Sequence, residues 1–91
     1  MKTITLQIGN TDNKLTQIEW SDFVGDIAIM LEKLDAKIHF FGGPMNWEIW
    51  QNVAWVFEAQ NDNMIFQEVK RIRRKFNQDS AAWTEGDTIF I

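Results

Sequence analysis

Residues 38–58, with the sequence IHFFGGPMNWEIWQNVAWVFE, constrain the fold of this chain more than any other stretch. Apolar and aromatic residues occupy both ends, and Gly42-Gly43-Pro44 interrupts regular structure between them. The pattern predicts one strand over residues 37–41, a second over residues 50–59, and an open loop over residues 42–49. Two of the five tryptophans lie in or beside that loop. We therefore expect a strand pair whose connecting loop carries Trp47.

The segments on either side predict two further strands and two helices. Residues 3–8 alternate apolar and polar side chains, which is typical of a strand with one buried face. Thr16 and Glu19 have the spacing of a capping box, and a helical apolar stripe follows them to residues 34–35. After a polar break at residues 60–63, a second apolar stripe runs from Ile65 to Phe76. We expect a loop over residues 77–85 and a last strand over residues 88–91.

The predicted order is β-α-β-β-α-β. Two split βαβ units form a ferredoxin-like sandwich, an α+β fold in which both helices cover one face of an antiparallel sheet. A chain of 91 residues makes one domain, so we expect a single domain over residues 1–91. The predicted core takes its apolar side chains from three strands and both helices: Ile4, Leu6, Ile8, Phe23, Ile27, Leu31, Ile38, Phe40, Trp55, Phe57, Ile65, Val69 and Ile72.

Composition and charge exclude several classes of function. Without cysteine there is no disulfide, thiolate metal site or cysteine nucleophile, and the lone His39 supplies no multi-histidine site. The carboxylates are dispersed and no phosphate-binding loop is present, so we expect no metal and no cofactor. The net charge of −4 argues against nucleic acid as a partner. Because no apolar run is long enough for a signal sequence or a membrane span, we expect a cytoplasmic protein without a membrane partner.

Three connections should meet at one end of this fold, because successive strands and helices alternate in direction. They are residues 9–15, 42–49 and 77–85, and we call their meeting place the loop end. Loops held by a rigid scaffold tend to carry function, so we expect a protein partner to bind there. The candidate partner-binding residues are polar or aromatic: Asn10, Asp12, Lys14, Trp47, Glu48, Gln78, Asp79 and Trp83.

Each of these features also has a structural interpretation. Trp47 and Trp83 could simply cover the core, since large aromatic residues are buried on average. Asp12 and Asp79 are typical of turns in which the side chain bonds to the following backbone. The basic run over residues 70–75 suits the negative end of a helix dipole and could be no more than a solvated helix end.

Three blocks of the sequence carry a resemblance. IGNTDNKLTQIEW over residues 8–20, QNVAW over residues 51–55 and QDSAAW over residues 78–83 resemble blocks found in a family of small uncharacterised bacterial proteins. The resemblance carries over no activity. It implies that the polar residues 10–17 and 78–80 contribute more than loop structure.

The leading hypothesis for function is a non-catalytic binding protein, such as an immunity or inhibitor protein that neutralises a basic toxin or enzyme. Tryptophan anchors ringed by polar groups are typical of interface hot spots, and an acidic surface speeds capture of a basic partner. The alternative is a sensor or binding module for a phosphate or a nucleotide, held by Arg71 and Arg74 with the polar loop residues. No catalytic constellation is visible, so we do not expect an enzyme.

Self-association is a further expectation. The sheet face opposite the helices should carry Phe41, Ala54 and Val56 among polar side chains, with no helix to cover it. An uncovered, partly apolar face predicts weak homodimerisation.

Overall fold

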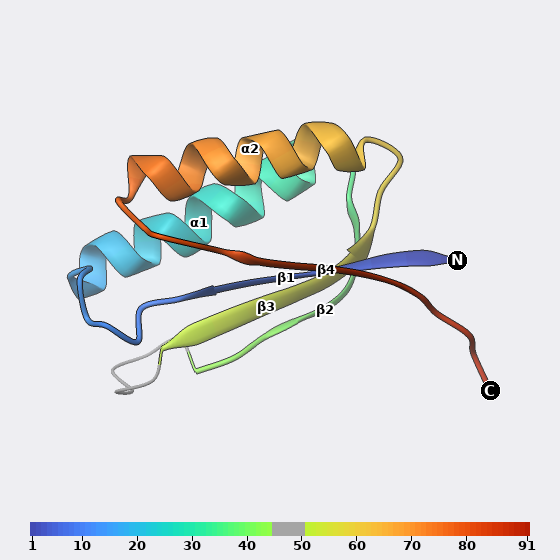
Figure 1. The fold of residues 1–91 in the computed structure, drawn as a ribbon, viewed down its shortest axis with the longest axis horizontal. Helices are drawn as coiled ribbons and strands as arrows, with labels where there is room; N and C mark the ends of the chain where they lie inside the picture. The colour runs from blue at the N-terminus through green and yellow to red at the C-terminus, as the bar shows by residue number, and fades with distance from the viewer. Residues whose placement is uncertain (45–50) are drawn as a thin grey trace.

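The computed structural model describes residues 1–44 and 51–91. Their elements are β1 (Lys2–Gly9), α1 (Gln17–Lys33), β2 (Lys37–Gly42), β3 (Asn52–Glu58), α2 (Asp62–Lys75) and β4 (Ala82–Asp87). The strands form one antiparallel sheet in the order β2-β3-β1-β4. Both helices lie on one face of this sheet, as Figure 1 shows. The predicted ferredoxin-like α+β fold is confirmed.

Local hydrogen bonds define the ends of the helices. At the start of α1, the Thr16 hydroxyl accepts from the Glu19 amide at 3.2 Å and the Glu19 carboxylate accepts from the Thr16 amide at 3.0 Å, which is the predicted capping box. The hydrogen bond that the carboxylate accepts from the Thr16 amide, followed by the effect of the Thr16 side chain, holds the pKa of Glu19 below its ordinary value. Two residues after the end of each helix lies a residue with left-handed backbone, Asp35 after α1 and Asn77 after α2, each with φ of 56°. That conformation lets the next amide bond back into the last turn.

The core lies between the sheet and the helices. Eleven of the thirteen predicted core residues are buried there, and the core also includes Leu15, Trp20, Met30 and Val53. Phe57 and Phe23 are almost completely enclosed. Alternation in β1 and β3 directs every second side chain toward the helices, so the period-2 pattern predicts these strands well.

Strand β2 differs from the prediction. Ile38 and Phe40 were expected in the core, but they are 43% and 55% exposed. One reason is that β2 is an edge strand, next to β3 alone. The other is a register shift between Ile38 and Phe40, which inserts His39 as an extra residue. The bulge reverses the expected faces: Phe41 pairs with Trp55 on the helix side, whereas Phe40 pairs with Val56 on the open side.

Strand β4 also lies elsewhere than predicted. The loop was expected over residues 77–85 and the strand over residues 88–91, but the strand is Ala82–Asp87. The reason is that β4 pairs with β1, and β1 begins at Lys2. Because Lys2 already pairs with Asp87, β1 offers no backbone partner to the residues after Asp87. Residues 89–91 therefore extend beyond the sheet and their side chains are exposed.

Candidate functional site

The loop end is held together by a buried polar cluster around Asn10. The Asn10 side chain donates to the Leu15 carbonyl at 3.1 Å and to the Gln51 side-chain oxygen at 2.9 Å, and it accepts from the Leu15 amide at 3.0 Å. Gln17 extends the cluster through Gln51, with hydrogen bonds of 2.8 and 3.2 Å. Asn10 and Gln51 are buried, so their amides shape the loop and are not available to a partner.

An ion pair joins the first and last of the three connections. The Lys14 ammonium lies 3.0 Å from the Asp79 carboxylate and 3.6 Å from that of Asp12. The hydrogen bond to Asp79, more than that to Asp12, raises the pKa of Lys14. All three side chains are exposed, so they form a polar surface at the loop end. The expectation that these two connections meet is confirmed.

The other predicted loop-end residues have different positions. Gln78 is buried, and its side chain donates to the Phe76 carbonyl at 3.2 Å. Trp83 was expected in a loop, but it lies in β4 opposite Leu6. Its half-buried ring makes edge-to-face contacts with Phe57 and Phe66, at centroid distances of 6.1 and 5.1 Å. Trp47 and Glu48 lie outside the described residues.

Much of the basic run of α2 is engaged within the protein. Arg71 pairs with Glu68 at 2.8 Å, and Lys75 pairs with Asp26 of α1 at 2.7 Å. Arg73 donates to the Gln78 carbonyl at 2.8 Å and so holds the turn after α2. The hydrogen bond from Arg71 lowers the pKa of Glu68, and the same bond raises that of Arg71. These contacts favour a structural role for much of the run.

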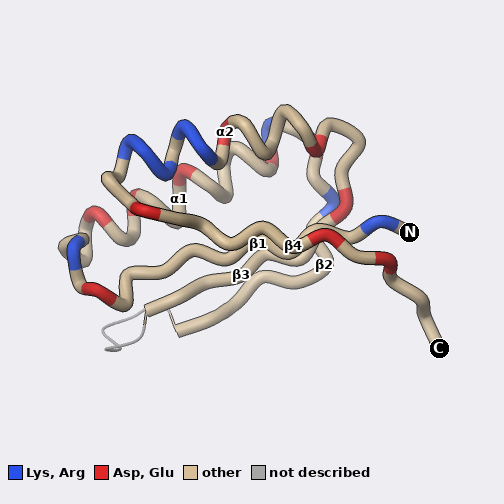
Figure 2. The backbone as a smooth tube through the Cα atoms, viewed as in Figure 1, with Lys and Arg blue, Asp and Glu red and all other residues tan. Residues whose placement is uncertain are grey.

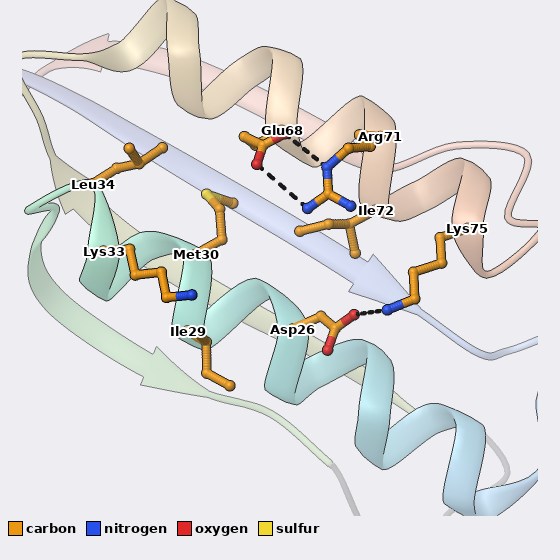
Figure 3. Close-up of a pocket in the computed structure, with 9 residues that line it drawn as sticks. All are labelled: Asp26, Ile29, Met30, Lys33, Leu34, Glu68, Arg71, Ile72 and Lys75. Atoms are coloured by element: carbon orange, nitrogen blue, oxygen red, sulfur yellow. Dashed lines mark hydrogen bonds and ion pairs between the residues drawn. The ribbon is translucent and has the colours of Figure 1, made fainter.

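Arg71 and Lys75 line a groove between the two helices. Figure 3 shows it, with Asp26, Met30 and Lys33 on α1 facing Glu68, Arg71 and Lys75 on α2. The groove encloses about 310 Å³, and Met30 and Ile72 form part of its apolar floor. Within the described residues, Lys33 is the lining cation that makes no ion pair. The groove therefore combines an apolar floor with a mixed charged rim.

A second groove, between α1 and β2, was not predicted. It encloses about 380 Å³, and its lining is apolar except for one carboxylate: Ala28, Leu31, Glu32, Ala36, Ile38, Phe41 and Trp55. The Phe41 and Trp55 rings lie 5.2 Å apart in its wall. We call this groove the α1–β2 surface. Its lining comes from α1, β2, β3 and the turn between α1 and β2, so no local pattern in the sequence marks it.

The two helices carry opposite charge. Helix α1 has four carboxylates and one lysine, whereas α2 has two carboxylates and five cations. Figure 2 shows the cations gathered along the second half of α2. The α1–β2 surface consequently lies beside the acidic helix.

Metal-binding clusters and membrane-spanning helices are both absent from the described part of the chain. Residues 1–44 and 51–91 contain no group of three or more histidine, cysteine or carboxylate side chains that could hold a metal. Among the described helices, none has both the length and the apolar character needed to cross a membrane.

Comparison with known proteins supports the fold. No protein-family model matches this chain, and no curated protein matches it. A solved structure, formyltetrahydrofolate deformylase from Burkholderia mallei, superposes with a TM-score of 0.52 at 17% sequence identity. The match covers 94% of this chain but spans only 27% of that protein. Likeness at this identity shows the ferredoxin-like fold alone.

Proposed function

We propose that this chain is a cytoplasmic, non-catalytic binding domain that docks a partner protein on the α1–β2 surface. The observation that carries the proposal is the apolar groove itself, whose wall is partly exposed. Ile38 and Phe41 on β2 are each 43% exposed, and they line the groove together with Trp55. Exposed apolar surface gathered in one place marks an interaction site.

An immunity or inhibitor role remains our proposal for the biological purpose. The acidic helix beside the groove suits a basic toxin or enzyme, because complementary charge raises the rate of association. The loop end is the competing surface for the same partner. Its candidates are Asp12, Lys14 and Asp79, which are exposed, together with Trp47 and Glu48.

Site-specific photo-crosslinking separates the two surfaces. Benzoylphenylalanine would replace Ile38 on the α1–β2 surface, Asp12 at the loop end, or Met64 at the start of α2 as a control. After irradiation in the native host, we expect one protein to be crosslinked from position 38 and not from position 64. Crosslinking from position 12 alone would move the site to the loop end. Absence of a defined product at every position would contradict a dedicated protein partner.

The alternative function is binding of a small anion, and the groove between the helices favours it. Lys33, Arg71 and Lys75 line this groove, which has an apolar floor, and Lys33 makes no ion pair with a described residue. A ligand that binds only the folded state raises its melting temperature by mass action. Inorganic phosphate, ATP and GTP would be tested by thermal shift against the wild type and Lys33→Met. Stabilisation that is lost in Lys33→Met would support the anion site, and equal melting temperatures throughout would reject it.

A further inference from the structure

The sheet has one face that no described helix covers, because α1 and α2 both lie on the other side (Figure 1). We propose that this open face packs against the same face of a second copy of the chain, back to back, with the helices of both copies pointing outward. The α1–β2 surface lies on the helix side of the sheet, so such a dimer leaves it accessible on both copies.

Strand pairing arranges the side chains of the open face in three rows that cross the sheet. In β1 and β3 every second side chain is buried against the helices, and the residues between them point to the open face. Residues that pair in neighbouring strands lie side by side on this face. The first row is Gly42, Ala54, Gln7 and Ala82; the second is Phe40, Val56, Thr5 and Thr84; the third holds the pairs Lys37–Glu58 and Thr3–Gly86.

Charge is concentrated in the third row. The first two rows contain no charged residue, although 24% of the chain is charged and about two charges would be expected among eight positions. The third row carries one cation and one anion, Lys37 and Glu58, and the Glu58 carboxylate also lies 2.8 Å from the His39 ring nitrogen. Depletion of charge distinguishes the centre of an interface from the rest of a protein surface.

The neutral rows fit a second copy of the same face. Two copies that meet here bring together no net charge, since each contributes one Lys37 and one Glu58, so like-charge repulsion does not oppose them. Two-fold dimers, in which both copies use the same patch, are the commonest protein oligomers. Most side chains in the first two rows are small, which lets two sheets approach to the usual separation of about 10 Å.

Phe40 is the largest apolar side chain in these rows, and its surface is 55% exposed. Its ring extends over Gly42, because a methyl group at Gly42 would lie only 3.0 Å from the ring carbon Cζ. The glycine therefore gives the ring room within the open face. The exposed part of the ring can contact the small side chains of the second copy, as aromatic anchors do in interfaces.

The size of the face predicts a weak dimer. Four strands about 4.8 Å apart and three rows about 6.7 Å apart cover roughly 400 Å² on each copy. The pair would bury roughly 800 Å² in total, below the 1,200 Å² or so at which stable interfaces begin. Residues 89–91 can add to this area, since each is more than three-quarters exposed and the tail leaves the sheet on the side away from the helices. We therefore expect reversible association at high concentration.

Sedimentation equilibrium of the purified protein tests the proposal, with the protein itself as the probe. We expect a dissociation constant on the order of 100 μM, so the dimer fraction should rise between about 10 μM and about 1 mM. Gln7→Glu adds one charge with little change of shape at an exposed position of the first row. It should raise the dissociation constant by about tenfold or more, because the charge would lie inside the interface. Gln67→Glu, at an exposed position of α2, is the matched control and should change it by less than about twofold.

Phe40→Glu is the second variant, because it removes the largest apolar contact. Ile18→Glu is its matched control, since Ile18 is an apolar residue that is 75% exposed on α1, away from the open face. Phe40→Glu should give a monomer throughout the concentration range, and Ile18→Glu should behave as the wild type. Circular dichroism would check that each variant is folded. If Phe40→Glu does not fold, Gln7→Glu decides, because it replaces an exposed polar side chain.

Two results would overturn the proposal. One is a wild type that stays monomeric throughout the concentration range. The other is a dimer that the open-face variants weaken no more than their controls do, because its contact would then lie elsewhere. Neither result bears on the function proposed above, since the experiment contains no partner protein.

Discussion

Replacing Asn10 with alanine tests whether the loop end is built on its buried amide. The substitution removes three side-chain hydrogen bonds, two to the Leu15 backbone and one to Gln51. A hydrogen bond contributes about 1 kcal/mol net, and a buried backbone amide left without a partner costs about 1 to 3 kcal/mol. We therefore expect Asn10→Ala to lower the free energy of unfolding by about 2 to 4 kcal/mol. For a domain of this size, that is a large part of a total that begins near 5 kcal/mol.

Urea unfolding followed by tryptophan fluorescence would measure this loss. The midpoint should fall while the slope with denaturant stays constant, as expected when stability changes but compactness does not. The melting temperature should drop by more than about 8 °C, because 1 kcal/mol corresponds to roughly 4 to 8 °C in small domains. Asn10→Asp keeps the acceptor for the Leu15 amide but cannot donate, so it should lose nearly as much. Asp12→Ala, at an exposed position in the same loop, should change stability by less than about 0.5 kcal/mol. A loss of that small size for Asn10→Ala would refute the reasoning.

Three further predictions follow from the packing. Phe57→Ala should lower the free energy of unfolding by about 3 to 5 kcal/mol in denaturant titration, because the ring is fully enclosed; a loss below about 1 kcal/mol would contradict the core assignment. If weak homodimerisation uses the open sheet face, Phe40→Glu should give a monomer in sedimentation equilibrium. Phe41→Glu should not, because Phe41 lies on the helix side. A wild type that is monomeric at high concentration would contradict homodimerisation. The pKa of Glu19 is lower in the folded state than in the unfolded state, so its capping contribution to stability is present above the unfolded-state pKa and is lost as pH falls through the folded-state pKa. The melting temperature of Glu19→Gln should therefore fall less on acidification than that of the wild type. Equal falls would count against the capping role.

The sequence predicted where the site residues lie in the fold better than it predicted whether their side chains are exposed. Chain direction alone predicts that the connections at residues 9–15 and 77–85 meet at one end, and the Lys14–Asp79 pair confirms that they do. Sequence reasoning could not show that Asn10 and Gln78 are buried there, because turn residues of the same kind are usually exposed. Their burial depends on carbonyl and amide groups that only the folded loop presents.

The two errors in the sheet have one physical origin. In β2 the period-2 pattern assigned Phe40 to the core, but one inserted residue moves every later side chain to the other face. Residues 88–91 were predicted as the last strand, but a strand forms only where a neighbour offers backbone partners, and β1 offers them to Ala82–Asp87. Neither the bulge nor the pairing register leaves a clear mark on the local sequence.

The order of elements, the start of α1 and most of the core can be derived from the amino-acid sequence, because alternation, helical period and capping act between residues close together in the chain. The placement of β2 at a sheet edge, the bulge that exposes Phe40, the register of β4 and the groove between α1 and β2 required the tertiary structure. These features depend on contacts between segments far apart in sequence. In such segments, the folded sheet decides which backbone groups form hydrogen bonds and which apolar side chains are covered.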